Sequence, residues 1–428
     1  MKPLLTWDDF FGLQRFGMTR NLDNIRRFCK RLDHPEGNYP AVLVGGTNGK
    51  GTVVAALDSV LRSAGLKVGR YTSPHILSFG ERIHITGTPI SDEEVFAFLA
   101  EHWDFIREHH CTFFEVSTAM ALDAFRRGEV DIAVVEVGLG GTYDATGVVD
   151  SILSIITPID YDHTDRLGSD LQQIAADKAG IFRSGRKALI CDQQPEVANV
   201  LINRAEVFGA TLYRTSDVVE FSPLSVTPRG ITGAARISRA VGDVSLSELK
   251  FPLTGFFQIE NLKAALGASC LLADEFPGID GEAIQRGIEH VSWPGRLQEI
   301  EKKPTLIVDV GHNPGAVREV LLDVRRIWKP SKIAVIFSAL RDKDVIGMME
   351  ILKGEADRGF IVPLPAPRGL DVEEIETIAN QVGWVADSCL SAGEAINLAL
   401  TMTGERDLIL VIGSHLLVEE VLKNQKYS

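Results

Sequence analysis

The alternation of short apolar runs with helical patterns is the feature that most limits the folds open to this chain of 428 residues. Near-continuous apolar runs such as DIAVVEVGL and SILSIITPI are typical of parallel strands that are buried on both faces. Segments with helical spacing lie between them, including a helix expected from about Gln258. Strands that alternate with helices build a parallel sheet covered by helices, so we predict an α/β fold.

A break at VSWPGRLQEI divides this pattern, because Pro294 and Gly295 end a helix. We therefore expect a larger domain over 1–295 and a smaller, Rossmann-like α/β domain over 296–428. In the smaller domain, strands are expected at TLIVDV, KIAVIF, RGFIVPL and DLILVIG, and a helix is expected from about Val345. The segment from about 211 to 250 has short alternating stretches and turn residues, which predict an antiparallel excursion.

The segment VLVGGTNGKGTVVAAL lies between a strand expected over 39–44 and a helix expected over 52–64. It departs from the usual sequence motif of a phosphate loop, because Gly51 separates Lys50 from Thr52. Its glycines free the backbone to wrap N–H groups around an anion, while the helix N-terminus and Lys50 add positive charge. This favours nucleotide binding in a P-loop domain; the alternative is a strand-to-helix turn with a surface lysine.

Composition excludes several classes of protein. A net charge of -14 argues against a surface for nucleic acid or anionic membranes. Five scattered cysteines without a CxxC pair are typical of reduced thiols in the cytoplasm. The early charges in MKPLLTWDDFFGLQRF argue against a signal peptide, and no apolar run reaches the length of a membrane span. We expect a cytoplasmic protein that binds neither nucleic acid nor membrane.

Polar residues that follow the expected strands are the candidates for a site, because ligands bind at the carboxyl ends of strands in such sheets. Ser73 and His75 follow one strand in TSPHILSFGERI. Glu136 lies inside an apolar strand, where a carboxylate has to be paired, protonated or metal-bound. The segment DYDHTDRLG suits Mg²⁺ or Mn²⁺. A structural glutamate and a solvated acidic loop are the alternatives.

Three further motifs complete the candidates. Lys178, in IAADKAGIFRSG, is by itself typical of a surface lysine on a short helix. Arg296, in WPGR, lies at the domain junction. The motif VDVGHNPGA places Asp309, His312 and Asn313 between a strand and a helix expected from about Pro314, and SALRDKD and VIGSH also follow strands.

Together these motifs resemble the folylpolyglutamate synthase / dihydrofolate synthase family, a branch of the Mur ligases. The resemblance runs from about Phe16 to Leu417 and includes GTNGKGT, TSPH, FFE, EVGLGG, DHTDRLG, KAGIF, WPGR and GHNP. In this family an extra Gly after the Lys of the phosphate loop is the norm. The resemblance implies an ATP-dependent ligase that phosphorylates a folate or dihydropteroate carboxylate and joins L-glutamate to it, and we expect a monomer.

The resemblance also implies roles for individual residues. The loop that holds the phosphates of ATP comprises Gly46, Thr47, Asn48, Gly49, Lys50, Gly51 and Thr52. The nucleotide is further surrounded by Gln258, Asn261, Arg296 and Asp309. Two Mg²⁺ ions are implied, one held by Ser73 and Glu136, the second by His163 and a carbamylated Lys178. Catalytic roles fall on Lys50, His163, Lys178 and His312, and substrate contacts on Phe113, Phe114, Asp162, His312 and Ser414.

Three departures and two rival functions are noteworthy. Residues 140–147 are GGTYDATG where the family usually has GGRLDATN, Asp309 and His312 stand in DVGH rather than DGAH, and Thr52 replaces Ser. The missing Arg leaves the detail of that loop open. A cell-wall peptide ligase would carry a uridine-binding domain before the phosphate loop, where only about 45 residues precede Gly46. A nucleotide-dependent switch would explain the loop but not the other motifs.

Overall fold

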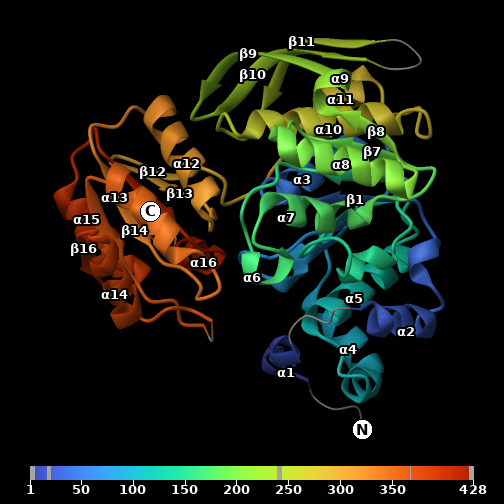
Figure 1. Ribbon diagram of the computed structural model, residues 1–428, viewed down its shortest axis with the longest axis horizontal. Helices are drawn as coiled ribbons and strands as arrows, with labels where there is room; N and C mark the ends of the chain where they lie inside the picture. The colour runs from blue at the N-terminus through green and yellow to red at the C-terminus, as the bar shows by residue number, and fades with distance from the viewer. Residues whose placement is uncertain (1–4, 17–20, 239–242, 367, 424–428) are drawn as a thin grey trace.

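The computed structural model describes residues 5–16, 21–238, 243–366 and 368–423. It has two lobes, shown in Figure 1 with the second lobe in orange and red. The predicted α/β class is confirmed, because each lobe is built on a largely parallel sheet with helices on both faces. Among the described residues, no helix is both long and apolar enough to cross a membrane.

The sheet of the first lobe has eight strands in the order β4-β3-β2-β5-β1-β6-β7-β8, and it is parallel from β2 to β8. The central strands are buried along their whole length, as their continuous apolar sequences predict. The strands are β1 Ala41–Gly45, β2 Val68–Tyr71, β3 Ile83–Ile85, β4 Thr88–Pro89, β5 Ile132–Glu136, β6 Leu153–Ile156, β7 Lys187–Ile190 and β8 Thr211–Arg214.

Helices cover both faces of this sheet and enclose two apolar cores. One face is covered by α3 Lys50–Ser63, α10 Gln258–Leu272 and α11 Gly281–Glu289. The other is covered by α2 Asp23–Arg31, α4 Asp92–Glu108, α5 Phe113–Arg127, α7 Leu171–Lys178 and α8 Pro195–Phe208, with α1 Trp7–Phe11 at its margin. Two short helices are α6 Thr164–Leu167 and α9 Thr215–Val218.

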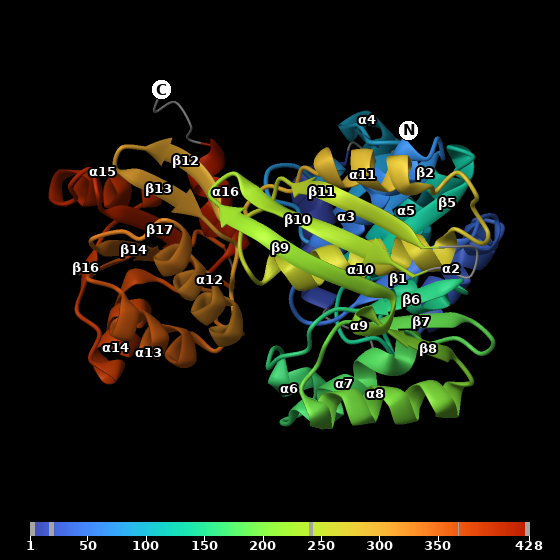
Figure 2. The ribbon, with the colours of Figure 1, turned by 90° about the horizontal axis from the view of Figure 1, so that it is seen from above.

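A three-stranded antiparallel sheet, β9 Val219–Thr227, β10 Gly230–Ile237 and β11 Val244–Phe251, follows the main sheet. It packs over α10 and α11 (Figure 2). The predicted antiparallel excursion is therefore confirmed from residue 219 onward. It is wrong for 211–214, because these residues pair in parallel with β7 and extend the main sheet as β8.

The sheet of the second lobe has the order β12-β13-β17-β14-β15-β16, and only β12 runs antiparallel to its neighbour. Its strands are β12 Gln298–Lys302, β13 Thr305–Val308, β14 Ile333–Phe337, β15 Arg358–Ile361, β16 Ala386–Ser388 and β17 Leu408–Ile412. Its helices are α12 Pro314–Ile327, α13 Val345–Glu355, α14 Val372–Val382, α15 Ala392–Met402 and α16 His415–Lys423. The helix starts expected at Pro314 and Val345 are confirmed.

Candidate active site

The loop between β1 and α3 has the geometry of an anion-binding turn. Gly49 precedes the helix with a φ of 90°, a left-handed conformation that favours glycine. The helix begins at Lys50, two residues earlier than expected, so its N-terminal N–H groups face the loop. The Lys50 ammonium donates to the carbonyls of Gly46 at 3.3 Å and Thr47 at 3.1 Å. Helix dipole, free N–H groups and ammonium thus converge on one place.

Helix α10 brings two of the expected nucleotide residues against this loop. A Cβ on Gly49 would lie 2.0 Å from Oδ1 of Asn261, so only glycine allows this approach. Asn261 donates through Nδ2 to Oε1 of Gln258 at 2.7 Å. Two buried polar atoms, Nε2 of Gln258 and Oγ1 of Thr52, have no hydrogen-bond partner among the described residues. Unpaired buried groups of this kind fit a site completed by a bound polar ligand.

Lys178 is buried, so its interpretation as a surface lysine is wrong. It ends α7, and its ammonium donates to the Gly46 carbonyl at 2.7 Å. Burial, and then the charge of Lys50, lower the pKa of Lys178 to about 7. Packing of α7 against the loop places this lysine inside the molecule, which its local sequence does not reveal.

Glu136 and Ser73 lie together at the carboxyl ends of β5 and β2. Glu136 is 4% exposed and accepts a hydrogen bond from the Ser73 N–H through Oε2 at 3.1 Å. Burial raises the pKa of Glu136, while the charge of Lys50 and the Ser73 N–H oppose the rise. The pair therefore offers a carboxylate and a hydroxyl beside the phosphate loop.

His163 lies in a different group, at the boundary between the lobes. The Lys343 ammonium approaches Oδ1 of Asp162 at 2.8 Å and Nε2 of His163 at 2.9 Å. Nε2 of His312 lies 3.6 Å from Oδ2 of Asp162. Burial, with the Lys343 charge, lowers the pKa of His163 to about 4 against the attraction of Asp162. The imidazole is neutral at neutral pH and accepts from Lys343.

Burial would raise the pKa of Asp162, but its contact with His312 and the charge of Lys343 dominate and lower it. Asp162 is therefore an anion that joins both lobes electrostatically. Sequence reasoning singled out Asp162 and His312 but missed Lys343. The motif SALRDKD, which follows β14, was the signal that pointed to this loop without identifying the residue.

The second lobe contributes further polar groups at the ends of β13 and β17. Asp309 is 3% exposed and accepts from the Leu297 N–H at 2.9 Å and the Gly311 N–H at 2.7 Å. Burial raises the pKa of Asp309, and the charge of Arg296 opposes the rise. Ser414 is buried between β17 and α16, and the neighbouring His415 ring lies 5.3 Å from that of His312.

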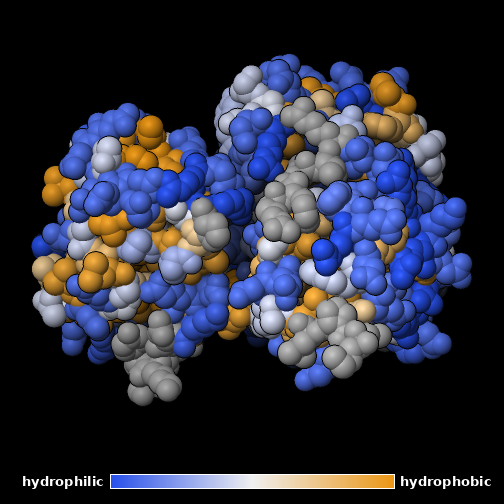
Figure 3. Space-filling view, turned by 90° about the horizontal axis from the view of Figure 1, so that it is seen from below, coloured by the Kyte–Doolittle hydropathy of each residue, from blue (hydrophilic) through white to orange (hydrophobic). Residues whose placement is uncertain are grey.

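Direct contact joins the phosphate loop to the second lobe. Asn313, the N-cap of α12, donates through Nδ2 to Oδ1 of Asn48 at 3.0 Å. Figure 3 shows the surface hollowed where the two lobes meet, with hydrophilic residues along the edges of the hollow. The two lobes therefore present their polar strand ends to each other.

Comparison with known proteins identifies the family. The model of the Mur ligase middle domain matches residues 44–269, and that of the Mur ligase, glutamate ligase domain matches residues 295–415. The dihydrofolate synthase/folylpolyglutamate synthase of Escherichia coli (strain K12) is 35% identical over 423 residues, which cover 98% of this chain and 95% of that protein.

The chain belongs to the Mur ligase family. Within this family it is an ATP-dependent ligase of the dihydrofolate synthase/folylpolyglutamate synthase type.

Solved structures of this ligase type share the whole fold. Mycobacterium tuberculosis folylpolyglutamate synthase complexed with ADP matches with a TM-score of 0.88 at 30% identity, over 97% of this chain and 96% of that chain. A bifunctional folylpolyglutamate synthase/dihydrofolate synthase with Mn, AMPPNP and L-glutamate bound matches with a TM-score of 0.82 at 31% identity, over 99% of each chain.

The structure of this ligase assembles some of the expected residues and separates others. Lys178 and Asn261 contact the phosphate loop, and Ser73 contacts Glu136. Of the residues expected to hold the second ion, His163 contacts Lys343, and Lys178 contacts the Gly46 carbonyl. In the part of the chain that the structure describes, no cluster of three or more His, Cys, Asp or Glu side chains could hold a metal ion.

The two aromatic candidates for the acceptor have different surroundings. Phe113 is 7% exposed, and its ring contacts Phe10 at 4.8 Å and the Arg82 guanidinium at 5.2 Å, which makes it a core residue. This packing favours the alternative of a core role for Phe113, and its expected substrate contact stays a prediction. Phe114 is half-buried beside Gly138, where an added Cβ would lie 2.3 Å from its ring. Phe114 stays a candidate.

The loop with the missing Arg is held by its own hydrogen bonds. Asp144 accepts from the N–H groups of Leu139 at 2.8 Å and Thr146 at 3.0 Å. Thr142 donates through Oγ1 to the carbonyl of Asp177 at 3.1 Å, next to Lys178. The residue that replaces Arg thus contacts the helix that carries the buried lysine.

Proposed function

We propose that this ligase joins L-glutamate to the carboxylate of a folate or of dihydropteroate, with cleavage of ATP to ADP and phosphate. The observation that carries the proposal is the convergence of the phosphate loop, Lys178 and the Ser73–Glu136 pair in one lobe, opposite Asn313 and Lys343 of the other. The ADP, AMPPNP and L-glutamate bound in solved relatives support the same reaction.

The residues divide the reaction between the two lobes. Lys50 and the N–H groups of the phosphate loop hold the phosphates of ATP, and their positive charge stabilises the phosphoryl group as an acceptor oxygen attacks it. ADP leaves, and an acyl phosphate remains. The amino group of glutamate attacks the carbonyl carbon of the acyl phosphate and loses a proton, phosphate departs, and an amide forms. We assign the binding of glutamate in the second lobe to Lys343, His312 and Ser414.

The residues around the phosphate loop fit a divalent cation. Glu136 supplies an oxygen, Ser73 supplies a hydroxyl, and Oγ1 of Thr52 is buried without a partner. Oxygen ligands of this kind suit Mg²⁺ or Mn²⁺. When bound, the ion supplies positive charge to the transferring phosphoryl group. The Mn in a relative supports this assignment, and His163 remains a predicted ligand of a second ion.

We further propose that Lys178 is carbamylated. Its lowered pKa leaves much of the amine neutral near pH 7, and the neutral amine is the form that attacks CO₂ with loss of a proton. The product is a carbamate, whose oxygens would serve as metal ligands. An unmodified ammonium beside Lys50 and a divalent cation would be repelled.

The proposal extends to the domain boundary, the cellular compartment, the oligomeric state and the absence of nucleic-acid binding. We place the domain boundary between residues 295 and 296, just before the second sheet begins at Gln298. We propose a cytoplasmic monomer that binds no nucleic acid. The five cysteines support a reducing compartment, because each is buried and none forms a disulfide.

Release of ADP tests the function directly. The protein is mixed with Mg-ATP and L-glutamate, and each of dihydropteroate, dihydrofolate and tetrahydrofolate is added separately. We expect ADP release that requires both glutamate and an acceptor, together with a product heavier by one glutamyl residue. Ligation to an unrelated carboxylate, but to none of these acceptors, would overturn the choice of acceptor.

A further inference from the structure

Helix α12 of the second lobe contacts the first lobe at two places. Its N-cap, Asn313, donates to Asn48 of the phosphate loop. Asp323 lies ten residues further along the chain, about 15 Å at 1.5 Å per residue, and contacts the segment just before α10. Figure 2 shows α12 beside this end of α10. The second lobe is therefore attached both to the phosphate loop and to the helix that packs against that loop.

The carboxylate of Asp323 closes the turn from which α10 begins. Asp323 is fully buried, and its Oδ2 accepts from the N–H groups of Phe256 at 2.6 Å and Phe257 at 3.4 Å. Phe257 is the N-cap of α10. Gly255 has a φ of 116°, and an added Cβ there would lie 3.1 Å from Oδ2, so the backbone approaches the carboxylate closely. A negative charge at this place also suits the positive end of the helix dipole.

The first turn of α10 carries the two residues that this helix is expected to contribute to the nucleotide site. Gln258 directly follows the N-cap and is fully buried. Asn261 lies three residues further on, bonded to Gln258 and packed against Gly49 of the phosphate loop. A displacement of the start of α10 would move both side chains relative to that loop. Misplacement of a positioning group by about 1 Å can cost about a hundredfold in rate.

The surroundings of Asp323 favour this role over a purely stabilising one. Its Oδ1 is buried and has no hydrogen-bond partner among the described residues. The Arg326 guanidinium, on the same helix, lies 5.5 Å from the centre of the Phe256 ring. A buried carboxylate that is satisfied at one oxygen only is unfavourable for folding. Placement of α10 therefore explains this carboxylate better than stabilisation of the fold does.

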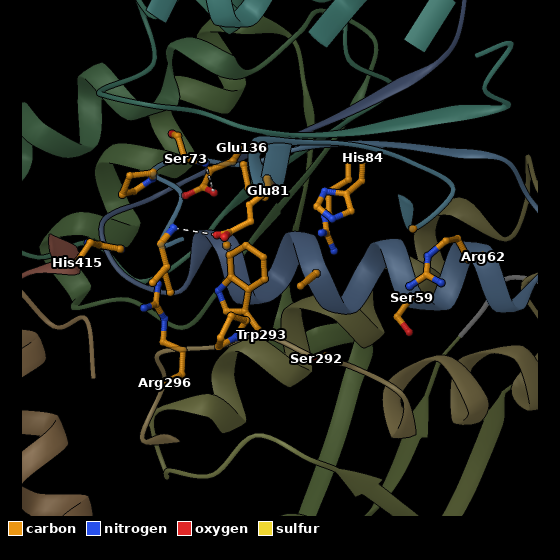
Figure 4. Close-up of a pocket in the computed structure, with 18 of the residues that line it drawn as sticks. Ser59, Arg62, Ser73, Glu81, His84, Glu136, Ser292, Trp293, Arg296 and His415 are labelled. Carbon is orange, nitrogen blue, oxygen red and sulfur yellow. Dashed lines mark hydrogen bonds between the residues drawn. The ribbon is translucent and has the colours of Figure 1, made fainter. Parts of the chain in front are cut away.

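Asp323 does not belong to the cavity beside the phosphate loop. Figure 4 shows Ser73, Glu136 and Arg296 on the wall of this cavity, which has a volume of about 320 Å³. Asp323 is not one of the residues that line it. Any effect of Asp323 on the nucleotide therefore passes through α10, which makes it a positioning residue.

We propose that the charged carboxylate of Asp323 positions Gln258 and Asn261 for the nucleotide by holding the start of α10 against α12. The contact makes the affinity for ATP depend on the packing of the second lobe against the first. The proposal rests on the nucleotide role of these two residues within the proposed function.

Binding of Mg-AMPPNP, measured by titration calorimetry, tests the role of Asp323. Asp323→Ala removes the acceptor, and we expect its Kd at pH 7.5 to be about tenfold higher, as for loss of one charge-assisted hydrogen bond. Asp323→Asn keeps a neutral acceptor of the same shape and should recover part of this loss, with a Kd about threefold above that of the wild-type protein.

Asp371→Ala is the matched control, because Asp371 caps another helix of the second lobe, α14, by accepting from the Glu374 N–H at 2.9 Å. Its Kd should equal that of the wild-type protein. An unchanged Kd in Asp323→Ala overturns the proposal, and so does an equal rise in Asp371→Ala. Asp323→Asn carries the test if Asp323→Ala does not fold.

The charge of Asp323 gives the proposal a second readout. Burial raises the pKa of Asp323 to about 6, and the N–H groups of Phe256 and Phe257 oppose the rise. The charge of Glu319 adds to the rise in this pKa, and the charge of Arg326 opposes it. The carboxyl is therefore charged at pH 7.5, and about nine tenths of it is neutral at pH 5.

The neutral carboxyl resembles the amide of Asp323→Asn. We therefore expect the ratio of Kd in Asp323→Asn to Kd in the wild-type protein to fall from about three at pH 7.5 to about one at pH 5. Titration of the nucleotide and of other side chains is common to both proteins and cancels in this ratio. A loss of stability alone would not produce this pH dependence, so a ratio that does not change with pH overturns the proposal.

Ligation separates this proposal from the proposed function. With Mg-ATP, L-glutamate and dihydropteroate, we expect Asp323→Asn to raise the KM for ATP about threefold at pH 7.5 and to leave the KM for dihydropteroate unchanged. If the wild-type protein ligates glutamate but the KM for ATP does not move, the role of Asp323 fails alone. If the wild-type protein ligates glutamate to no folate or dihydropteroate acceptor, while binding of Mg-AMPPNP still depends on Asp323, the proposed function fails and the positioning role stands.

Discussion

Replacement of Lys178 by Met should abolish ligase activity and yet make the protein more stable at low pH. The side chain is 5% exposed, and its pKa of about 7 lies below the ordinary value of 10.5. At pH 7.5 about three quarters of the amine is neutral, against about one part in a thousand at the ordinary pKa. The folded protein therefore holds a reactive amine at the cost of burying a group that prefers to be charged.

The sign of the pH effect follows from proton binding. Between pH 7 and pH 10.5 the unfolded lysine holds a proton that the folded lysine has released, so the wild-type protein gains stability as the pH rises. Below pH 7 both states are protonated, and the full penalty applies. From pH 6 to pH 9 the free energy of unfolding should rise by about 3 kcal/mol relative to Lys178→Met, which lacks this group.

This difference is measured by urea denaturation of both proteins at pH 6 and pH 9 in bicarbonate-free buffer. All other titrating groups are common to the two proteins, so their effects on the free energy of unfolding cancel. The chemistry is tested by ¹³C NMR with labelled bicarbonate, Mg²⁺ and ATP. A carbamate resonance is expected in the wild-type protein and not in Lys178→Met. A stability difference that does not depend on pH would refute the buried-amine reasoning, and absence of the resonance would refute the carbamate.

Four further substitutions test other parts of the molecule. Lys50→Ala should raise the activation barrier by ~3–4 kcal/mol with little change in stability, because one electrostatic stabiliser is lost; turnover near that of the wild-type protein would contradict the phosphate-loop assignment. Phe113→Ala should destabilise the protein by about 3–5 kcal/mol, as for other core aromatics. Phe114→Ala should instead raise the KM of the acceptor, and thermal denaturation with steady-state kinetics separates the two. Thr142→Arg should change the KM of the acceptor more than that of ATP, and equal changes in both would argue against a role in acceptor binding.

Local sequence was sufficient for most of the elements of this fold. Buried parallel strands are apolar on both faces, so β1, β5 and β6 can be predicted from their nearly continuous apolar sequences. The helix starts at Gln258, Pro314 and Val345 were also predicted, because capping and spacing signals are local. The strand β8 was missed, since its membership in the main sheet depends on pairing with β7 and not on its own residues.

Local sequence also predicted the phosphate loop and the polar residues at the strand ends. The carboxyl ends of parallel strands lie at one edge of the sheet, so polar residues that follow them in sequence are expected to lie together. Burial and pairing at that edge depended on tertiary packing. Lys178 is typical of a surface lysine in its own segment, but α7 buries it against Gly46. Lys343 meets His163 across 180 residues of chain, and no local pattern encodes that contact.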